Sequence, residues 1–363
     1  MRQVFFCICS PLQYLNAVEA RALFNDSCTK FYLVVFTDYD PVLLQINKLI
    51  DNCLWDDISF IKKRKSSRIK IFNRNPILFL DFYYRTNKLI RFIENIKKTG
   101  DLLVVGNINE VGCLALLSRW NGDTKYLLDD GQATVSFVAR KNSGDYRLPA
   151  TTRRFFTHLL FKIKKLKLNE LVFFTSYKNL DFSPAAVIFN DYKELRKTRT
   201  GNDFHQIPKG YFVGQDLPGN SIISESNYLS LIDKIRVWYI AHGFEFQYLV
   251  HRSEDLNRLP QNWNAIRLDI PIELHIAKSR ETPSIIGSIQ SSALLNLKQI
   301  FGTKLNLVQF SVPANLTSKH FKYKSEWQDI NNYIAQHTGS GFKIVDARTL
   351  ENFSWDFSEC ERQ

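Results

Sequence analysis

The first half of the chain alternates short apolar runs with longer segments whose apolar residues recur every three to four positions. The apolar runs are expected to form strands at residues 4–9, 31–36, 58–61, 102–105 and 125–128. The periodic segments are expected to form helices at residues 12–24, 41–52, 76–96 and 110–120. Such alternation predicts a parallel sheet with helices on both of its faces.

The second half repeats this alternation after a polar stretch at residues 191–210, which is interpreted as an interdomain linker. Strands are expected at residues 211–213, 247–250, 265–268, 284–287 and 304–310, and helices at residues 228–242, 271–277, 291–301 and 326–336. The predicted fold is therefore α/β and GT-B-like, with Rossmann-like domains at residues 1–190 and 211–363 that face each other across a central cleft. A final helix is expected to pack back on the first domain.

Composition places the chain among globular proteins, because 45% of its residues are apolar and 23% are charged. There are 48 basic and 36 acidic residues, so the net charge is +12, which favours anionic partners such as nucleotide sugars, acidic glycans or lipid headgroups. No apolar stretch is long enough for a membrane-spanning helix, and the first residues do not resemble a secretion signal. The expected location is the cytoplasm.

One basic segment suggests contact with a membrane surface. Residues 153–168, which begin at Arg153 and end at Leu168, mix basic and large apolar side chains and contain no acidic residue. A segment of this composition can lie on the anionic inner face of the cytoplasmic membrane, or it can be an ordinary basic helix that packs through its apolar side.

The sequence does not indicate a metal centre. Its six cysteines form no Cys-x-x-Cys pair and no zinc-type cluster with histidine, so we expect reduced, structural thiols and no metal. The triplet Asp38-Tyr39-Asp40 has the Asp-x-Asp pattern that binds metal and diphosphate in GT-A glycosyltransferases. It lies too early in the chain for that fold, and a second Rossmann-like half follows it.

Candidate catalytic residues follow the predicted strands, where ligands of parallel sheets bind. The strand at residues 125–128 ends in Asp129-Asp130-Gly131. Two close carboxylates repel each other, so the pKa of one of them is expected to rise towards the range of a general base. The alternative is a simple Asp-Gly turn.

Three other strand ends carry groups suited to a phosphate or a sugar. His251-Arg252 follows residues 247–250 and can hydrogen-bond and neutralise a phosphate. Ser288, Ser291 and Ser292 surround a predicted helix start, which is an anion site or an ordinary serine cap. The first strand ends in a tight polar loop, Cys9-Ser10-Pro11-Leu12-Gln13.

In order and spacing these motifs resemble those of bacterial sialyltransferases of glycosyltransferase family 52 and related capsule and lipooligosaccharide enzymes. That family has an acidic-acidic-glycine motif, then a His-Pro motif and a Ser-Ser/Thr motif, and the present chain has Arg252 in place of the proline. The opening loop is similar to the family's Cys-x-Thr/Ser-Pro-Leu-Gln. The segment Tyr211-Phe212-Val213-Gly214-Gln215 looks like the start of its second domain, and Pro271-Ile272-Glu273 looks like its Pro-x-Glu nucleotide contact.

The resemblance implies an inverting transferase that moves sialic acid, or a related nine-carbon acid, from its CMP-activated donor to a hydroxyl of a bacterial surface glycan. Asp129 or Asp130 would be the base, and His251 would protonate or hydrogen-bond the departing CMP phosphate. The remaining donor-site residues would be Arg252, Glu273, Ser288, Ser291, Ser292, Gly214, Gln215, Ser10 and Gln13. Because CMP has a single phosphate, no metal cofactor is expected, and the acceptor is expected to be lipid-linked.

Two other readings remain open at the level of the sequence. One is a GT-B transferase with another donor, such as CMP-Kdo, CMP-legionaminic acid or a UDP-sugar. The other is a non-catalytic basic protein that binds nucleic acid or anionic lipid, which would place stacking aromatic side chains beside the basic ones. Most aromatic residues here fall in apolar runs instead, which favours a core position and no nucleic-acid partner.

Overall fold

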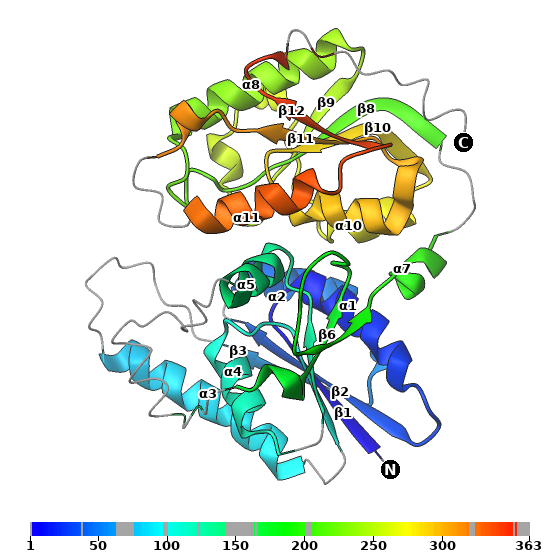
Figure 1. Ribbon diagram of the computed structural model, residues 1–363, viewed down its shortest axis with the longest axis vertical. Coiled ribbons are helices and arrows are strands. Elements are labelled where there is room, and N and C mark those ends of the chain that lie inside the picture. Colours follow the sequence, from blue (N-terminus) through cyan, green and yellow to red (C-terminus); the bar gives the residue numbers. More distant parts are fainter. Residues whose placement is uncertain are drawn as a thin grey trace. The chain divides into compact units, whose positions relative to one another are not determined.

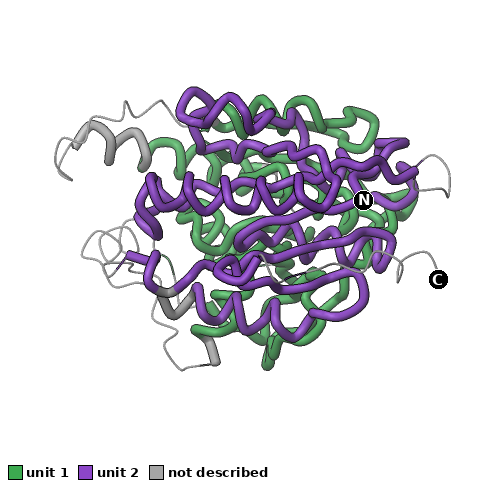
Figure 2. The backbone as a smooth tube through the Cα atoms, turned by 90° about the horizontal axis from the view of Figure 1, so that it is seen from above, with its two compact units in different colours: residues 1–194 green, residues 195–363 purple. Residues whose placement is uncertain are grey.

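The computed structural model describes residues 2–37, 39–62, 76–96, 101–121, 124–142, 161, 163, 166–199, 205–318, 324–350 and 353. The chain divides into two compact units, Met1–Glu194 and Leu195–Gln363 (Figure 2). Each unit is built on its own parallel sheet (Figure 1).

Unit 1 contains a seven-stranded sheet in the order β3-β2-β1-β4-β5-β6-β7, and all neighbouring strands are parallel. The strands are β1 (Arg2–Ile8), β2 (Thr29–Thr37), β3 (Asp57–Lys62), β4 (Leu102–Val105), β5 (Lys125–Leu128), β6 (Leu171–Thr175) and β7 (Ala186–Phe189). Residues 3–8 of β1 and all of β4 are buried, as expected for strands covered on both faces. Chain order reverses between β1 and β4.

The helices of unit 1 connect these strands. They are α1 (Pro11–Arg21), α2 (Asp40–Leu49), α3 (Pro76–Ile96), α4 (Val111–Arg119) and α5 (Gln132–Asn142), and α7 (Lys193–Lys197) follows at the boundary. Helix α1 begins at Pro11, whose missing N–H costs nothing in the first turn, and Ser10 caps it by accepting a hydrogen bond from the backbone N–H of Gln13 at 3.3 Å. Figure 1 shows α1 and α2 on one face of the sheet and α3 and α4 on the other.

Unit 2 contains a five-stranded parallel sheet in the order β12-β11-β10-β8-β9. The strands are β8 (His205–Val213), β9 (Glu245–Leu249), β10 (Glu281–Ser288), β11 (Leu307–Ser311) and β12 (Phe342–Asp346). The helices are α8 (Glu225–Ala241), α9 (Ile272–Lys278), α10 (Ser292–Phe301) and α11 (Lys324–Ala335). Figure 1 shows α8 on one face of this sheet and α10 and α11 on the other. Chain order reverses between β8 and β10.

Aromatic side chains fill the core of unit 2 beneath α8. Phe212 stacks on Tyr248 with 5.6 Å between ring centroids, and Tyr239 lies edge-on to Phe246 at 5.4 Å. Gly210 lets Tyr239 approach the sheet, because a Cβ atom at that position would lie 2.0 Å from the Tyr239 ring. Each such ring stabilises the fold by about 2 kcal/mol relative to an exposed one.

The α/β fold class expected from the sequence is confirmed, and several elements differ from the prediction. Residues 265–268 form no strand, because only one bridge, between Leu249 and Ile266, joins them to β9. The expected linker at residues 191–210 contains α7 and the first part of β8, so the boundary between units lies at Glu194 and Leu195. Elements β6, β7, β12 and α5 were not predicted. Whether a final helix packs back on the first domain stays a prediction, and beyond residue 350 the structure describes Phe353 alone.

Candidate active site

The strand orders place a binding edge in each unit. Ligands of open parallel sheets bind beyond the carboxyl ends of the strands, at the point where chain order reverses. In unit 1 this point lies between β1 and β4, and in unit 2 it lies between β8 and β10. The loops after these strands and their neighbours β5 and β9 contain nearly all residues singled out from the sequence.

Gln13 organises the edge of unit 1. Its side-chain oxygen accepts a hydrogen bond from the backbone N–H of Cys9 at 2.6 Å, and its amide nitrogen donates to Oδ1 of Asp130 at 2.6 Å. Gly106, directly after β4, leaves the room for this arrangement, because a Cβ atom there would lie 2.2 Å from Oε1 of Gln13. One buried amide thus joins the loops after β1 and β5 and fixes the Asp130 carboxylate.

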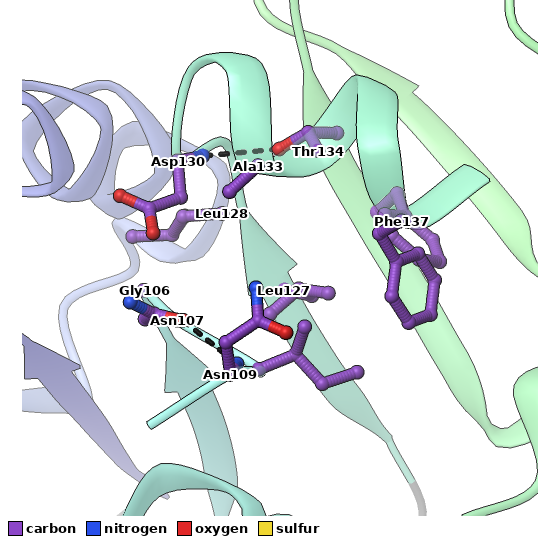
Figure 3. Close-up of a pocket in the computed structure, with 11 residues that line it drawn as sticks. Gly106, Asn107, Asn109, Leu127, Leu128, Asp130, Ala133, Thr134 and Phe137 are labelled. Carbon is purple, nitrogen blue, oxygen red and sulfur yellow. Dashed lines mark hydrogen bonds between the residues drawn. The ribbon is translucent and has the colours of Figure 1, made fainter. Parts of the chain in front are cut away.

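Asp130 lines a small pocket between the loops that follow β4 and β5 (Figure 3). The polar groups of its wall come from Asn107, Asn109, Asp130 and Thr134, and the Thr134 hydroxyl accepts a hydrogen bond from the backbone N–H of Asp130 at 3.1 Å. Apolar side chains complete the lining; they are Ile108, Leu127, Leu128, Ala133, Phe137 and Phe173. The space inside measures about 10 Å³, which is room for roughly one water molecule. A carboxylate at such a recess can accept a hydrogen bond from a single hydroxyl group.

Asp129 occupies a different environment although it is the adjacent residue. Its side chain is only 2% exposed, and its Oδ2 atom accepts hydrogen bonds from the backbone N–H and the hydroxyl of Ser176, at 2.6 and 3.2 Å. Its Oδ1 atom is buried and receives no hydrogen bond of normal geometry among the described residues. Asp129 therefore ties the end of β5 to the loop after β6.

Burial raises the pKa of Asp129 to about 6, against nearby donors from Thr175, Ser176 and Thr134 that favour the charged form. The expectation that one carboxylate of the pair has a raised pKa is thus met, but for another reason. Removal from water, rather than repulsion by Asp130, produces the shift.

Ser10 and Gln13, expected among the donor-site residues, lie at the edge of unit 1 as buried groups. The Ser10 hydroxyl is occupied by the cap of α1, and Gln13 by Cys9 and Asp130. Their hydrogen bonds hold the loop after β1 in place. Gln13 also contacts the candidate base directly.

His251 lies in the turn that follows β9 in unit 2. Its backbone N–H donates to Oε2 of Glu254 at 2.7 Å, and its ring Nδ1 lies 2.6 Å from the Ser253 hydroxyl and 3.3 Å from the Ser253 backbone nitrogen. Burial lowers the pKa of His251 to about 4, and the positive charges of Arg252 and Arg267 act in the same direction against Asp216. The ring is therefore neutral near pH 7.

A buried hydrogen-bond network supports this turn. Oε1 of Glu254 accepts from the hydroxyl of Tyr248 at 2.6 Å and from that of Tyr228 at 3.4 Å, and the two hydroxyls are 2.6 Å apart. Tyr228 also accepts from the backbone N–H of Gln215 at 3.3 Å, so the network joins the turns after β8 and β9. Burial raises the pKa of Glu254, although hydrogen bonds from Tyr248 and His251 oppose the shift.

Gly214 and Gln215 lie in the turn after β8. A Cβ atom at position 214 would lie 2.3 Å from the Tyr248 hydroxyl and 2.6 Å from Oε2 of Glu254, so only glycine fits above the network. Oε1 of Gln215 accepts from the backbone N–H of Gln290 at 3.3 Å, which brings the loop after β10 to the same edge. The Gly214-Gln215, His251-Arg252 and Ser291-Ser292 motifs are thus brought together within unit 2.

The three serines at this end of β10 differ in how free their hydroxyl groups are to bind a ligand. Ser288 is fully buried and donates its hydroxyl to the Val213 carbonyl at 2.8 Å, which joins β10 to β8. Ser291 caps α10 by accepting from the backbone N–H of Ala293 at 3.2 Å, and Ser292 is the first residue of that helix. Ser292 and the first backbone N–H groups of α10 are therefore better placed for an anion than Ser288 is.

Glu273 lies on α9 and is 4% exposed. Its Oε1 atom accepts from the side-chain amide of Asn296 on α10 at 2.8 Å, and burial raises the pKa of its carboxyl group. The residue expected to contact the ribose is thus held against α10, the helix whose N-terminus forms the candidate phosphate site.

Some expectations concern residues outside those described. Most of the basic segment at residues 153–168 falls there, with only Phe161, Ile163 and residues 166–168 described, and so does Asp38 of the Asp-x-Asp triplet.

In the part of the chain that is described, no group of three histidine, cysteine, aspartate or glutamate side chains is placed to hold a metal ion. The five described cysteines carry free thiols. No helix among the described residues is both long and apolar enough to span a bilayer.

Several residues at these edges were not singled out from the sequence. Ser176 was missed because β6 was not predicted, and Tyr228 and Tyr248 resembled ordinary core residues. Asn107 and Asn109 follow a strand that was predicted, so their position at a strand end could have identified them. Ser253 and Glu254 follow His251-Arg252 directly, but nothing in the sequence shows their contacts.

Comparison with known proteins supports the fold. No protein-family model matches the sequence, and no curated protein matches it. Among solved structures, TcCGT1 in complex with UDP is similar with a TM-score of 0.51 and 10% identity, over 99% of this chain and 89% of that one. LpCGTa in complex with UDP has the same TM-score with 11% identity, over 100% and 91%. With its two Rossmann-like units, the chain has an α/β GT-B fold.

Proposed function

We propose that this protein is an inverting glycosyltransferase that moves sialic acid, or a related nonulosonic acid, from its CMP-activated donor to a hydroxyl of a bacterial surface glycan. The observation that carries the proposal is the division of chemistry between the two sheet edges. Unit 1 presents a fixed carboxylate at a pocket, and unit 2 gathers histidine, arginine and a serine-capped helix start at one edge. The order of the motifs, which resembles family 52 sialyltransferases, supports the donor class.

Asp130 is the base in this proposal. Asp130 lines the pocket and is only partly buried, so we infer that an acceptor hydroxyl can approach its carboxylate, and Gln13 fixes one of its oxygens. Asp129 is buried and bonded to Ser176, so it supports the end of β5 instead. A base must lie within hydrogen-bond distance of the proton that it takes, which favours Asp130 on geometry even though the pKa of Asp129 is raised.

The donor would bind at the edge of unit 2. His251, Arg252, Ser291, Ser292 and the first N–H groups of α10 would surround the single phosphate of CMP, while Glu273 would accept hydrogen bonds from the ribose. Gly214 and Gln215 would form the neighbouring wall, and Ser288 would support it from below. These groups supply positive charge and donors for one phosphate, so the proposed reaction needs no divalent cation.

The reaction balances as a direct displacement. The acceptor oxygen gives its proton to Asp130 and forms a bond to the anomeric carbon of the donor sugar, on the face opposite the phosphate. The bond from that carbon to the phosphate oxygen breaks, and CMP leaves with the electron pair. Arg252 and the helix N-terminus stabilise the charge that develops on the phosphate, and His251 hydrogen-bonds it.

We place the acceptor on a lipid carrier at the inner face of the cytoplasmic membrane. The basic and apolar composition of residues 153–168 supports this placement. Vesicles that contain anionic lipid would then retain the protein, and neutral vesicles would not.

The second candidate is a GT-B transferase with another donor. The two similar structures contain UDP, which favours a test of UDP-sugars beside CMP-Kdo and CMP-legionaminic acid. The purified chain should be offered each donor with a lipooligosaccharide acceptor, with and without a chelator. Release of CMP from CMP-sialic acid that persists with chelator supports the proposal, and turnover of a UDP-sugar alone would replace it with the second candidate.

The third hypothesis is not an enzyme but a basic protein that binds nucleic acid or anionic lipid, and the net charge of +12 suggests it. It predicts salt-sensitive binding to DNA and no protection by CMP. The transferase predicts that CMP raises the unfolding temperature, because a ligand that binds only the folded state stabilises it.

A further inference from the structure

The Ser253 side chain lies against His251 in a way that the motif resemblance does not explain. Its hydroxyl is 2.6 Å from the imidazole Nδ1, and its backbone nitrogen is 3.3 Å from the same atom. A backbone N–H can only donate a hydrogen bond, so Nδ1 must be the acceptor. In a neutral ring the proton then resides on Nε2, the opposite nitrogen.

Different groups hold the backbone of this turn and the imidazole ring of His251. The His251 N–H donates to Glu254, whose other oxygen accepts from Tyr248 and Tyr228. Because Gly214 packs directly over Glu254 and Tyr248, the turn has little room to move. Ser253 therefore contacts the ring at Nδ1, and Nε2 is the opposite nitrogen of the ring.

We propose that Ser253 is a positioning residue that fixes the Nε2–H tautomer of His251, so that His251 acts as a neutral hydrogen-bond donor to the leaving phosphate. The function of this donor rests on the transferase proposed above, whereas the tautomer is a property of the protein alone. Ser253 itself touches no substrate in this proposal.

The charges around the ring are consistent with a neutral donor. Arg252 and Arg267 disfavour a second proton on the ring, and Asp216 opposes them. Together with burial, the two arginines keep the pKa of His251 far below its usual range, so the ring should stay neutral from pH 8 down to pH 5.5. A neutral imidazole with a fixed N–H can donate to an oxyanion without giving up its proton.

The test is a long-range ¹H–¹⁵N spectrum of the full-length, ligand-free protein labelled at histidine. The chain has seven histidines, and His251→Gln identifies the signals of residue 251. The proposal expects a protonated Nε2 and an unprotonated Nδ1, with no titration between pH 8 and pH 5.5. A protonated Nδ1, or an equal mixture of tautomers, would overturn it.

Ser253→Ala then measures what the hydroxyl contributes. The variant keeps the backbone N–H of residue 253 at 3.3 Å but loses the closer hydroxyl, so we expect part of the population to shift to the Nδ1–H tautomer. We expect kcat to fall about tenfold with KM little changed, which is the lower end of the loss seen when a group that orients a metal-bound histidine is removed. Ser253→Thr should restore both. The matched control is Ser284→Ala, which removes a half-buried hydroxyl of unit 2 that donates to the Ile207 carbonyl.

The two proposals fail in different ways. An unchanged tautomer in Ser253→Ala overturns the role of the Ser253 side chain, whatever the enzyme turns over, because the backbone N–H that the variant keeps is then enough to fix the ring. A correct tautomer without transfer of any CMP-sugar leaves Ser253 as assigned and overturns the proposed donor. A shifted tautomer with an unchanged rate overturns the catalytic use of the Nε2–H group.

Discussion

The two sheet edges use opposite chemistry on the same topology. In unit 1, the loops after β1, β4 and β5 gather a carboxylate, amides and hydroxyls, and Gln13 fixes Asp130. In unit 2, the loops after β8, β9 and β10 gather histidine, arginine and a helix start above the network of Tyr228, Tyr248 and Glu254. In the proposed function, the edge of unit 1 takes a proton and the edge of unit 2 holds an anion. The fold supplies the position, and a few side chains supply the function.

The largest expected effect tests the edge of unit 1. Asp130→Asn should lower kcat by about 10³-fold, because it removes a general base while preserving shape and the contact with Gln13. Asp129→Asn is the matched control, with the same change one residue away, and should lose less than about tenfold. Initial rates of CMP release measure both. Equal losses in the two variants would contradict the distinction between the adjacent carboxylates.

The next effect tests the edge of unit 2. His251→Ala should lower kcat by about 10²-fold, since it removes one donor to the leaving phosphate. His242→Ala is a control of the same type, because His242 lies at the end of α8 and its ring bonds the Trp238 carbonyl. Near-normal turnover in His251→Ala would reject the assigned role.

The two glycines sharpen the comparison between the edges. Gly214→Ala and Gly106→Ala should each cost about 2 kcal/mol of stability, because each new Cβ meets a buried side chain at 2.2–2.3 Å. Their functional effects should differ. Gly106→Ala should displace Gln13 and impair transfer while CMP still protects the protein, whereas Gly214→Ala should displace Tyr248 and weaken that protection. Unfolding curves with and without CMP measure both effects.

The smallest effect concerns the buried carboxyl of Asp129. Its pKa rises from 3.8 to about 6 on folding, so the folded state binds more protons between these values. Wild-type stability should therefore fall by about 1 kcal/mol from this group between pH 5 and pH 8. Asp129→Asn lacks this titration. The unfolding free energy of the variant should therefore increase relative to that of the wild type as the pH rises from 5 to 8. A pH-independent difference between the two would contradict the raised pKa.

Much of the fold could be predicted from the sequence because buried parallel strands appear as continuous apolar runs. Strands β1, β2, β4 and β5 were predicted in this way. Edge strand β7 has such a run, AVIF, but was not predicted, and it is partly exposed because it lies at the edge of the sheet. Edge strand β12, FKIVD, has no continuous run because Lys343 interrupts it. The segment at 265–268 shows the opposite error, since an apolar pattern alone does not create hydrogen-bonded partners.

The site was less predictable than the fold. Strand ends predicted where Asp130 and His251 lie, because their place depends on topology, whereas Gln215 was proposed only from the resemblance to family 52. Nothing in the sequence distinguishes Asp129 from Asp130, since their difference arises from burial against Ser176, a contact across 47 positions. Similarly, Glu254 gains its role from Tyr228 and Tyr248, which come together only in the folded sheet.

The most direct test of the account compares binding with transfer in three proteins. Wild type, Asp130→Asn and His251→Ala should be unfolded by heat with and without CMP, and assayed with CMP-sialic acid. CMP should protect Asp130→Asn as well as wild type although transfer is lost, and protection should fall in His251→Ala. Equal protection of all three, no protection of any, or full transfer by Asp130→Asn would contradict it.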